Sequence, residues 1–423
     1  MLNDERTTPL QPLSSKNAYA TLLTRPNYLA GAVLLAYTLH KYSPSTPLII
    51  MYTPSTLNDS SIRVLEAESS RTSTIIHPVE HLQLPQPSSN DKEAEGKASG
   101  MVAERFADTW TKLRVFQLQS YGYEKICFLD ADMMIFRDPS PLIFDSPLKP
   151  GNEMLATHVC VCNLDHDAWA PEEWKPENCA YSSVTAGEDG AVPEVVPDSP
   201  TLSVMNTGTF VFRASKEIEK LVFDQFYGMG RTRLAAYKFP DQDFLNDVFK
   251  GRWASLHWST NSLKTWKYWH GNMWRDEDVR VLHYIVDKPW ARRVGEDGRA
   301  GYKGDDGVTH TWWWEEFERW RSERNGEGRE GKDTVLGLEK YVASANGEGD
   351  DHSLKVIGGG AQDFAKKWQG SNELEDLELV SHGFNPRKPM VGEHGHGPVV
   401  IERPQLSAAV NQPQLNPSNQ NEQ

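Results

Sequence analysis

The chain has 423 residues, of which 38% are hydrophobic and 24% charged, so it holds enough apolar sequence for a sizeable buried core. Its formal net charge of −15 argues against a dedicated nucleic-acid-binding protein, because such proteins need a basic surface to meet phosphate. No apolar run approaches the roughly 18 residues of a membrane span, and the first residues lack the apolar stretch of a signal peptide. We therefore expect a cytoplasmic protein with no membrane span and no nucleic-acid partner.

The cysteine content also favours a reducing compartment. The chain contains Cys127, Cys160, Cys162 and Cys179. A secreted protein of this length usually carries more cysteines, in an even disulfide framework. His158 and His166 lie near the Cys160–Cys162 pair, but this spacing is not one of the common zinc patterns. The sequence therefore favours reduced structural thiols over a zinc site.

The first part of the chain alternates between strand and helix patterns. Strands are expected at 17–24, 48–52, 72–77 and 125–130, and helices at 27–42, 59–69 and 104–120. Continuous apolar runs such as LIIMY are typical of strands buried on both faces of a parallel sheet. Repeated strand–helix–strand units predict one Rossmann-like α/β sheet flanked by helices. Ligands of such sheets bind at the carboxyl ends of the strands.

The second part of the chain is less regular. Strands are expected at 203–215 and 279–286, and helices at 216–227, 240–249 and 312–320. An insertion rich in Pro, Gly and acidic residues occupies about 161–200, and residues 322–423 have the composition of a low-complexity, largely disordered tail with one or two marginal helices. The predicted organisation is a flexible N-terminus over 1–16, one domain over 17–321, and this tail.

The sharpest chemical signal is FLDADMMIF, in which Asp130 and Asp132 follow a buried strand. Side chains two residues apart in an extended chain point the same way, so the two carboxylates can converge, and Ala131 leaves room for a ligand. Converging carboxylates repel each other unless a cation lies between them, and hard oxygen donors suit Mg²⁺ or Mn²⁺. His283 ends another apolar strand and is a candidate third ligand. Because imidazole is a softer donor, His283 favours Mn²⁺.

Two further segments offer groups for an anionic ligand. Lys288 follows the His283 strand and could meet a phosphate as a point charge. Asn206 and Thr207 precede a glycine that permits close approach of a ligand, so their amide and hydroxyl groups are candidate contacts. Taken alone, His283 is also consistent with a core histidine whose hydrogen bonds are satisfied within the protein.

Two more groups have an ordinary structural alternative. Lys112 lies on the helix that precedes the Asp130 strand, where a solvated helix face would explain it equally well. Asp241 and Gln242 open a helix behind Pro240, where a capping box would also account for them. The sequence leaves both alternatives open.

Taken together, the segments resemble glycosyltransferase family 8, which contains glycogenin and galactinol synthase. The resemblance rests on NAYATLLT, NYLAGA, TKLR, FLDAD, MNTGTFVF, DQDFLN and HYxxxKPW, which occur in this order over about 17–320. It implies a GT-A-type mixed sheet and a retaining hexosyltransferase that uses a UDP-sugar donor with Mn²⁺, or with Mg²⁺ as the alternative. The DQDFLN segment and the Trp-rich end look closer to galactinol synthase.

The resemblance also implies roles for individual residues. It implies that Leu23, Thr24 and Tyr28 hold the uracil and ribose, that Ala131 lies against the nucleotide, and that Asn206 and Thr207 contact the donor sugar. It implies that Asp130, Asp132 and His283 bind the metal, that Lys112 and Lys288 lie near the sugar and diphosphate, and that Asp241 and Gln242 lie beside the anomeric carbon. The segment between His283 and Lys288 is shorter than is usual in the family, where it often includes glycine.

The acceptor stays open at this point. A small polyol or sugar is the first expectation, a glycogenin-like self-glucosylating primer is the second, and a glycan, lipid or protein acceptor is a further alternative. A sugar-nucleotide pyrophosphorylase would need a glycine-rich phosphate loop after the first strand, and TRPNYLAGA is not one. The retained acidic residues disfavour a non-catalytic binder. The insertion at 161–200 is expected to shape the acceptor side, and a homodimer is left open.

Overall fold

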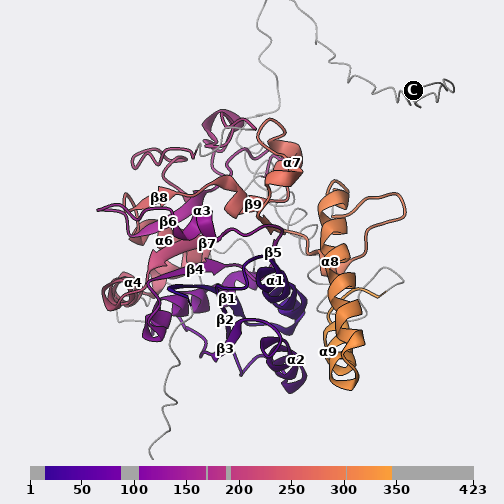
Figure 1. Cartoon of the computed structure of the whole chain (residues 1–423). Coiled ribbons are helices and arrows are strands. Elements are labelled where there is room, and N and C mark those ends of the chain that lie inside the picture. Colours follow the sequence, from indigo (N-terminus) through magenta and orange to yellow (C-terminus); the bar gives the residue numbers. More distant parts are fainter. Residues whose placement is uncertain (1–14, 87–103, 168–169, 187–191, 302, 345–423) are drawn as a thin grey trace, which may run out of the picture. The chain divides into compact units, whose positions relative to one another are not determined.

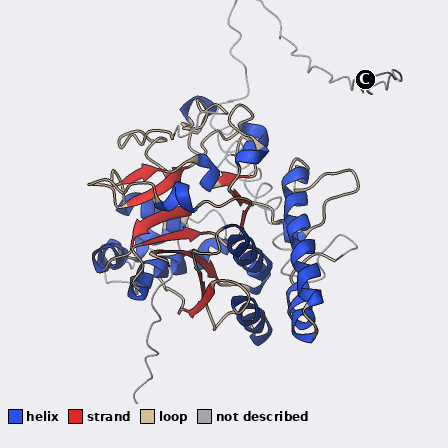
Figure 2. Cartoon of the chain, in the orientation of Figure 1, coloured by secondary structure: helices blue, strands red, loops and turns tan. Residues whose placement is uncertain are grey.

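A seven-stranded mixed sheet forms the centre of the protein, in the order β3-β2-β1-β4-β7-β6-β8 (Figure 1). The computed structural model describes residues 15–86, 104–167, 170–186, 192–301 and 303–344. Strands β3, β2, β1 and β4 are parallel to one another, and β7 runs antiparallel between β4 and β6. Helices flank the sheet (Figure 2). The predicted fold, a mixed α/β sheet flanked by helices, is confirmed.

The strands form two sheets. The large sheet contains β1 (Asn17–Leu23), β2 (Leu48–Tyr52), β3 (Thr74–Pro78), β4 (Lys125–Leu129), β6 (Met154–His158), β7 (Met205–Arg213) and β8 (Trp253–Ser255). A three-stranded sheet of order β5-β10-β9 contains β5 (Met133–Ile135), β9 (Ser262–Leu263) and β10 (Val281–His283). The strand predicted at 279–286 is therefore shorter than expected, because the chain leaves β10 directly after His283.

The helices lie where the periodicity predicted most of them. The α-helices are α1 (Leu29–Tyr42), α2 (Asp59–Ser69), α3 (Ser140–Phe144), α4 (Lys216–Met229), α5 (Arg231–Ala235), α6 (Pro240–Val248), α7 (Trp266–Trp269), α8 (Gly307–Gly326) and α9 (Arg329–Glu339). The 3₁₀ helices are η1 (Pro26–Tyr28), η3 (Glu104–Tyr121), η4 (Pro176–Asn178), η5 (Trp258–Thr260), η6 (Asp276–Asp278) and η7 (Pro289–Ala291). Of the described helices, none is long and apolar enough to cross a bilayer.

The central strand β1 is buried on both faces, which explains its continuous apolar sequence. Tyr19 and Leu23 belong to one apolar cluster, with α1, α8 and the small sheet. Ala18 and Ala20 belong to the other, with η3, α4 and α6. The sheet is therefore covered on two sides.

The described structure continues past residue 321, where the domain was predicted to end. Helix α8 continues to Gly326, and α9 follows it and packs on α2. Arg324 meets buried Glu68 of α2 through Nε at 2.6 Å and Nη2 at 3.0 Å, and Leu338 of α9 is fully buried. These contacts join distant segments, so the polar local composition did not reveal them. The flexible start predicted over 1–16 falls mostly, and the tail from 345 entirely, outside the described residues.

The insertion predicted at about 161–200 is irregular in its described part. Its described residues contain the single 3₁₀ turn η4, and the remainder consists of turns and extended segments. The insertion leaves the sheet after β6 and returns to it at β7. It is also bound to the α7 region, because Ala186 donates to the carbonyl of Asn272 at 2.7 Å.

Candidate active site

The three predicted metal ligands meet beyond the carboxyl end of β4. Asp130 follows β4, and its N–H donates to the carbonyl of Gly208 at 2.9 Å. The carbonyl of Asp132 accepts from the N–H of Tyr284 at 2.9 Å, which holds the turn against the end of β10. The His283 Nε2 lies 3.3 Å from Asp132 Oδ1 and 3.9 Å from Asp130 Oδ2. One ligand atom from each residue lies within 4.8 Å of the others.

Asn261 fixes the orientation of the His283 ring. Its Nδ2 donates to Thr157 Oγ1 and to Asn206 Oδ1, both at 2.8 Å. The Asn261 Oδ1 is therefore an acceptor, and the His283 Nδ1–H donates a hydrogen bond to it at 2.9 Å. With Nδ1 protonated, the neutral ring presents the Nε2 lone pair to the two carboxylates, which is the form that binds a metal.

The close approach of β7 to this histidine requires glycine at position 208. A Cβ built on Gly208 would lie 2.5 Å from His283 Cε1 and 2.9 Å from Asn206 Oδ1. Any larger residue would displace the ring or the Asn206 amide. Gly208 was predicted to permit close approach of a ligand, and in the structure its missing Cβ makes room for the His283 ring.

Lys112 is a buried ion-pair partner rather than part of a solvated helix face. Its Nζ lies 2.9 Å from Asp130 Oδ1 and 2.5 Å from Asp241 Oδ2, and Asp241 also accepts from Thr207 Oγ1 at 3.1 Å. The capping alternative for Asp241 is wrong, since Asp243 accepts the N–H groups that precede α6. Asp241 is therefore available to the site.

Asn246 fixes the start of α6 against the start of β7. Its Oδ1 accepts from the N–H of Met205 at 2.8 Å, and its Nδ2 donates to the carbonyls of Met205 and Gln242, both at 2.9 Å. This clamp holds the half-buried Gln242 on the helix turn next to the first residues of β7. The half-buried Asn206, whose Oδ1 accepts from the N–H of Gly208 at 2.9 Å, lies on that strand.

Lys288 reaches the metal-ligand group in spite of the short segment before it. Its Nζ pairs with Asp132 and donates to the carbonyl of Tyr284 at 2.7 Å. Within this segment Val286 has a φ of 63°, which is strained for a β-branched residue. The shortened segment therefore holds valine in a backbone conformation that favours glycine.

The residues predicted to hold the nucleoside lie at the end of β1 and in η1. Leu23 is fully buried, so its side chain serves the core, and its carbonyl accepts from Thr53 N–H at 3.2 Å. Thr24 and Tyr28 are half-buried, and the Tyr28 ring packs edge-on against Trp290 at 5.8 Å. Ala131 is buried.

The Ala131 turn lies directly against α1. A Cβ on Gly31 would meet the carbonyl of Ala131 at 2.2 Å and the Trp290 ring at 2.8 Å. Helix α1 can therefore approach the turn only with glycine at this position. The contact brings the Asp130–Asp132 turn, η1 and η7 into one region.

Burial and neighbouring charges shift the pKa values of Asp130 and Asp132 in opposite directions. Burial raises the pKa of Asp130, and Lys112 is the strongest of the groups that act against this shift. Burial also acts to raise the pKa of Asp132, but Lys288 and His283 outweigh it and hold that pKa well below its usual range. For Lys112, burial acts to lower the pKa, and Asp130 with Asp241 more than reverses this.

The donor set fits a hard or borderline divalent cation. Two carboxylates and one imidazole with its Nε2 free are suitable ligands for Mn²⁺, and Mg²⁺ accepts the two oxygens more readily than the nitrogen. With all groups ionised, Asp130, Asp132 and Asp241 against Lys112 and Lys288 leave one excess negative charge. A divalent cation would make the cluster net positive, which suits an anionic ligand such as a diphosphate.

Asn261 is the functional residue that the sequence reasoning missed. It lies 22 positions before His283 in an unremarkable polar run, and only the parallel pairing of β9 with β10 brings it to the ring. We expect Asn261→Ala to weaken Mn²⁺ binding about 10–100-fold, because the ring loses the acceptor that fixes its tautomer. Calorimetric titration of Mn²⁺ measures this. The exposed Asn178 makes one local bond and provides the control Asn178→Ala, and equal affinities in the two variants would contradict the role.

The sequence is similar to known glycosyltransferases. Residues 20–293 match the family described as glycosyl transferase family 8. Galactinol synthase 3 of Arabidopsis thaliana is 24% identical over 306 residues, which are 70% of this chain and 80% of that protein. The glycogenin of Neurospora crassa is 22% identical over 303 residues, which are 70% of this chain and 34% of glycogenin. A crystal structure of the galactosyltransferase LgtC with donor and acceptor sugar analogues aligns with 70% of this chain and 94% of that one, at 16% identity and a TM-score of 0.43.

The family match covers more than half of the chain and includes every predicted site residue from Leu23 to Lys288. The matched range contains the whole of the large sheet except the first residues of β1. The converging carboxylates, histidine and lysines lie at the carboxyl end of that sheet, where ligands of α/β folds bind. The chain therefore belongs to glycosyl transferase family 8 and is a hexosyltransferase.

Proposed function

We propose that the protein is a Mn²⁺-dependent retaining transferase that moves a hexose from a UDP-sugar to a hydroxyl of a small polyol or sugar. The proposed metal and donor are supported by one observation. Asp130, Asp132 and the Nε2 of His283 converge, and the Nδ1 of His283 is hydrogen-bonded to Asn261. These residues would hold a divalent cation, which would supply positive charge for the donor diphosphate.

The chain's own residues suit the cleavage of a sugar–phosphate bond. Cleavage builds negative charge on the departing diphosphate and positive charge on the anomeric carbon. A bound divalent cation would stabilise the diphosphate charge, and we assign the same role to Lys112 and Lys288, which are buried and already placed beside the metal ligands. We assign to Asp241 and Gln242 the stabilisation and orientation of the oxocarbenium-like carbon.

The acceptor assignment rests on the relatives. Galactinol synthases of Arabidopsis thaliana and Solanum lycopersicum match about four fifths of their own length, whereas the match to glycogenin covers a third of that protein. A small polyol such as myo-inositol is therefore the first acceptor to test. Retention of the anomeric configuration is proposed from the family. The insertion at 161–200 is proposed to border the acceptor because it joins β6 to the strand that carries Asn206.

A self-glucosylating primer is the second candidate, favoured by the glycogenin relative. A primer needs an accessible tyrosine as its first acceptor. Within the described residues, Tyr227 on α4 and Tyr268 on α7 are 57% and 41% exposed. These two side chains are the ones to replace by phenylalanine if the protein gains hexose.

The deciding experiment measures UDP release from a panel of UDP-sugars with Mn²⁺, with and without myo-inositol, while mass spectrometry follows the intact protein. We expect UDP release to rise with added acceptor at unchanged protein mass, and the product's anomeric coupling constant in NMR to match that of the donor. Protein mass that grows in hexose steps, and stops growing in Tyr227→Phe or Tyr268→Phe, would replace the proposal by the primer. Absence of Mn²⁺-dependent UDP binding would contradict the donor assignment itself.

Three further properties remain predictions. They are a cytoplasmic location, a homodimer, and the use of Mn²⁺ in preference to Mg²⁺. The last follows from the imidazole ligand, and comparing the two metals in the UDP-release assay tests it.

A further inference from the structure

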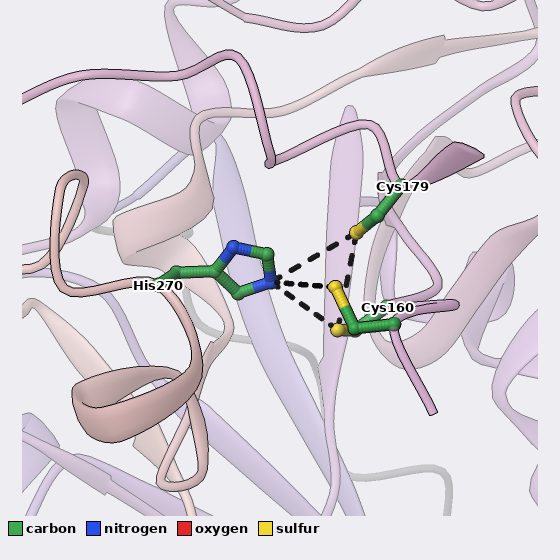
Figure 3. A group of neighbouring side chains, drawn as sticks. Cys160, Cys179 and His270 are labelled. Carbon is green, nitrogen blue, oxygen red and sulfur yellow. Dashed lines mark hydrogen bonds between the residues drawn. The ribbon is translucent and has the colours of Figure 1, made fainter. Parts of the chain in front are cut away.

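A second group of metal-ligand side chains lies outside the donor site. The sulfurs of Cys160, Cys162 and Cys179 face the Nε2 of His270, which lies at the end of α7. Figure 3 shows the His270 ring directed at Cys160 and Cys179. The His270 Nε2 lies 3.4 Å from the Sγ of Cys160, 3.4 Å from that of Cys162 and 3.8 Å from that of Cys179. Cys179 Sγ lies 3.9 Å from Cys160 Sγ. Cys162, Cys179 and His270 are buried, and Cys160 is half-buried.

Hydrogen bonding does not explain this arrangement. A neutral imidazole nitrogen has either one proton or one lone pair, so Nε2 can form one ordinary hydrogen bond and not three. A disulfide does not explain it either, because a covalent S–S bond is about 2.0 Å long and would leave the third sulfur and the imidazole without a role. Three soft donors and one nitrogen directed at a common point are the pattern of a metal site.

The spacing agrees with zinc. Tetrahedral zinc with bonds of about 2.3 Å to sulfur and about 2.0 Å to nitrogen separates two sulfurs by roughly 3.8 Å, and sulfur from nitrogen by roughly 3.5 Å. The corresponding separations here are 3.9 Å for Cys179–Cys160 and 3.4–3.8 Å for the sulfur–nitrogen pairs. These four separations, with all four ligand atoms within 4.8 Å of one another, fit a single tetrahedral ion.

We propose that Cys160, Cys162, Cys179 and His270 bind a structural Zn²⁺ ion. Four protein ligands close the tetrahedron, so no position is left for substrate, which is typical of structural and not catalytic zinc. Binding would release the three thiol protons to solvent and leave a site with one net negative charge. The histidine ligand is His270, and neither of the two histidines near the cysteines in the sequence takes that place. His158 packs on Trp253, and His166 is exposed.

The site would fasten the insertion to the core. It joins the segment after β6, the residue after η4 and the end of α7, so it links the irregular insertion to a segment about 90 positions further along the chain. Thr157, three residues before Cys160, accepts from Asn261, which holds His283. A zinc ion here would therefore fix the end of β6 two hydrogen bonds away from the donor-site histidine.

The test uses the full-length protein produced in zinc-containing medium. Elemental analysis should give about one zinc per chain, and Cys162→Ser and His270→Ala should each lower this content at least about tenfold. Cys127→Ala is the matched control, since that buried thiol lies in β4, and Asp132→Asn is the control for zinc in the donor site. Both controls should retain the zinc. Co²⁺ in place of zinc should give the visible bands of a tetrahedral thiolate site.

Three results would overturn the proposal. The first is wild-type protein without zinc that also gives no tetrahedral Co²⁺ spectrum, a result that does not depend on whether any variant folds. The second is zinc content that Cys162→Ser leaves unchanged or that Asp132→Asn abolishes. The third is two, and not four, free thiols in the denatured unreduced protein, which would show a disulfide within the cluster. Loss of glycosyl transfer does not enter this test, so it is independent of the proposed function.

Discussion

Replacing Asp132 by asparagine should lower kcat/KM at least about 10³-fold, or about 4 kcal/mol, while the fold stays intact. Asp132 faces His283 and pairs with Lys288, so the substitution removes one charged metal ligand and the partner of a buried lysine. Its contact with Tyr284 is made by the backbone carbonyl and is retained by asparagine. The loss should therefore be specific to metal and donor binding, and Mn²⁺ titration together with UDP-release kinetics measures it.

The exposed Asp224 on α4 gives the matched control for that experiment. Its carboxylate pairs with Lys220 at the surface, and Asp224→Asn should leave kcat/KM within about twofold, since exposed pairs contribute little. Circular dichroism and thermal unfolding should show that both variants are folded. Metal-dependent turnover of Asp132→Asn close to the wild-type rate would refute the assignment of the metal site.

Replacing Lys112 by methionine should lower kcat/KM about 10²–10³-fold. Methionine keeps the length of the side chain but removes the charge between Asp130 and Asp241, so the half-buried Asp130 and the buried Asp241 lose their cation. Burial raises the pKa of Asp130 and Lys112 is the strongest group opposing this, so the pKa rises further in the variant. A carboxylate must be deprotonated to bind metal, and the loss should therefore be larger at pH 6 than at pH 8.

Lys220→Met is the control for the lysine experiment, because the Lys220 side chain is 74% exposed and forms a surface pair on one helix. It should show the pH profile of the wild type. A Lys112→Met protein whose activity loss is the same at both pH values would show that the lysine does not act through the Asp130 carboxyl. Full activity would contradict its role beside the diphosphate.

The Asp130–Asp132 turn could be predicted because its signal is local. Two carboxylates separated by one residue and following an apolar run are recognisable in the sequence. The regular alternation of strands and helices predicts that they lie at the carboxyl end of a sheet. Lys112 and Asp241 were named as candidates, but sequence could not separate a site role from a solvated face or a helix cap. In the structure Lys112 forms an ion pair with Asp241, so Lys112 is not on a solvated helix face. Asp243 accepts the N–H groups before α6, so Asp241 is not the helix cap.

The C-terminal boundary of the domain gives no comparable local signal. Polar, glycine-rich sequence after residue 321 has the composition of a tail, and composition reports only what a segment can bury by itself. Glu68 and the α2 surface lie more than 250 positions away, and the Glu68–Arg324 pair holds the end of α8 to the core. Long-range partners of this kind leave no periodic trace near the residues that they stabilise.

The sequence alone indicated the α/β class, the order of the motifs, and the carboxylates, histidine and lysines that converge at the end of the sheet, because each of these follows from short-range patterns. Only the tertiary structure decided that Asn261 sets the His283 tautomer and that His270 joins the three cysteines. His270 lies 91 positions after Cys179, so no common zinc spacing contains it. Both arrangements arise where separate loops meet at the end of a sheet, and the folded chain alone brings such partners into contact.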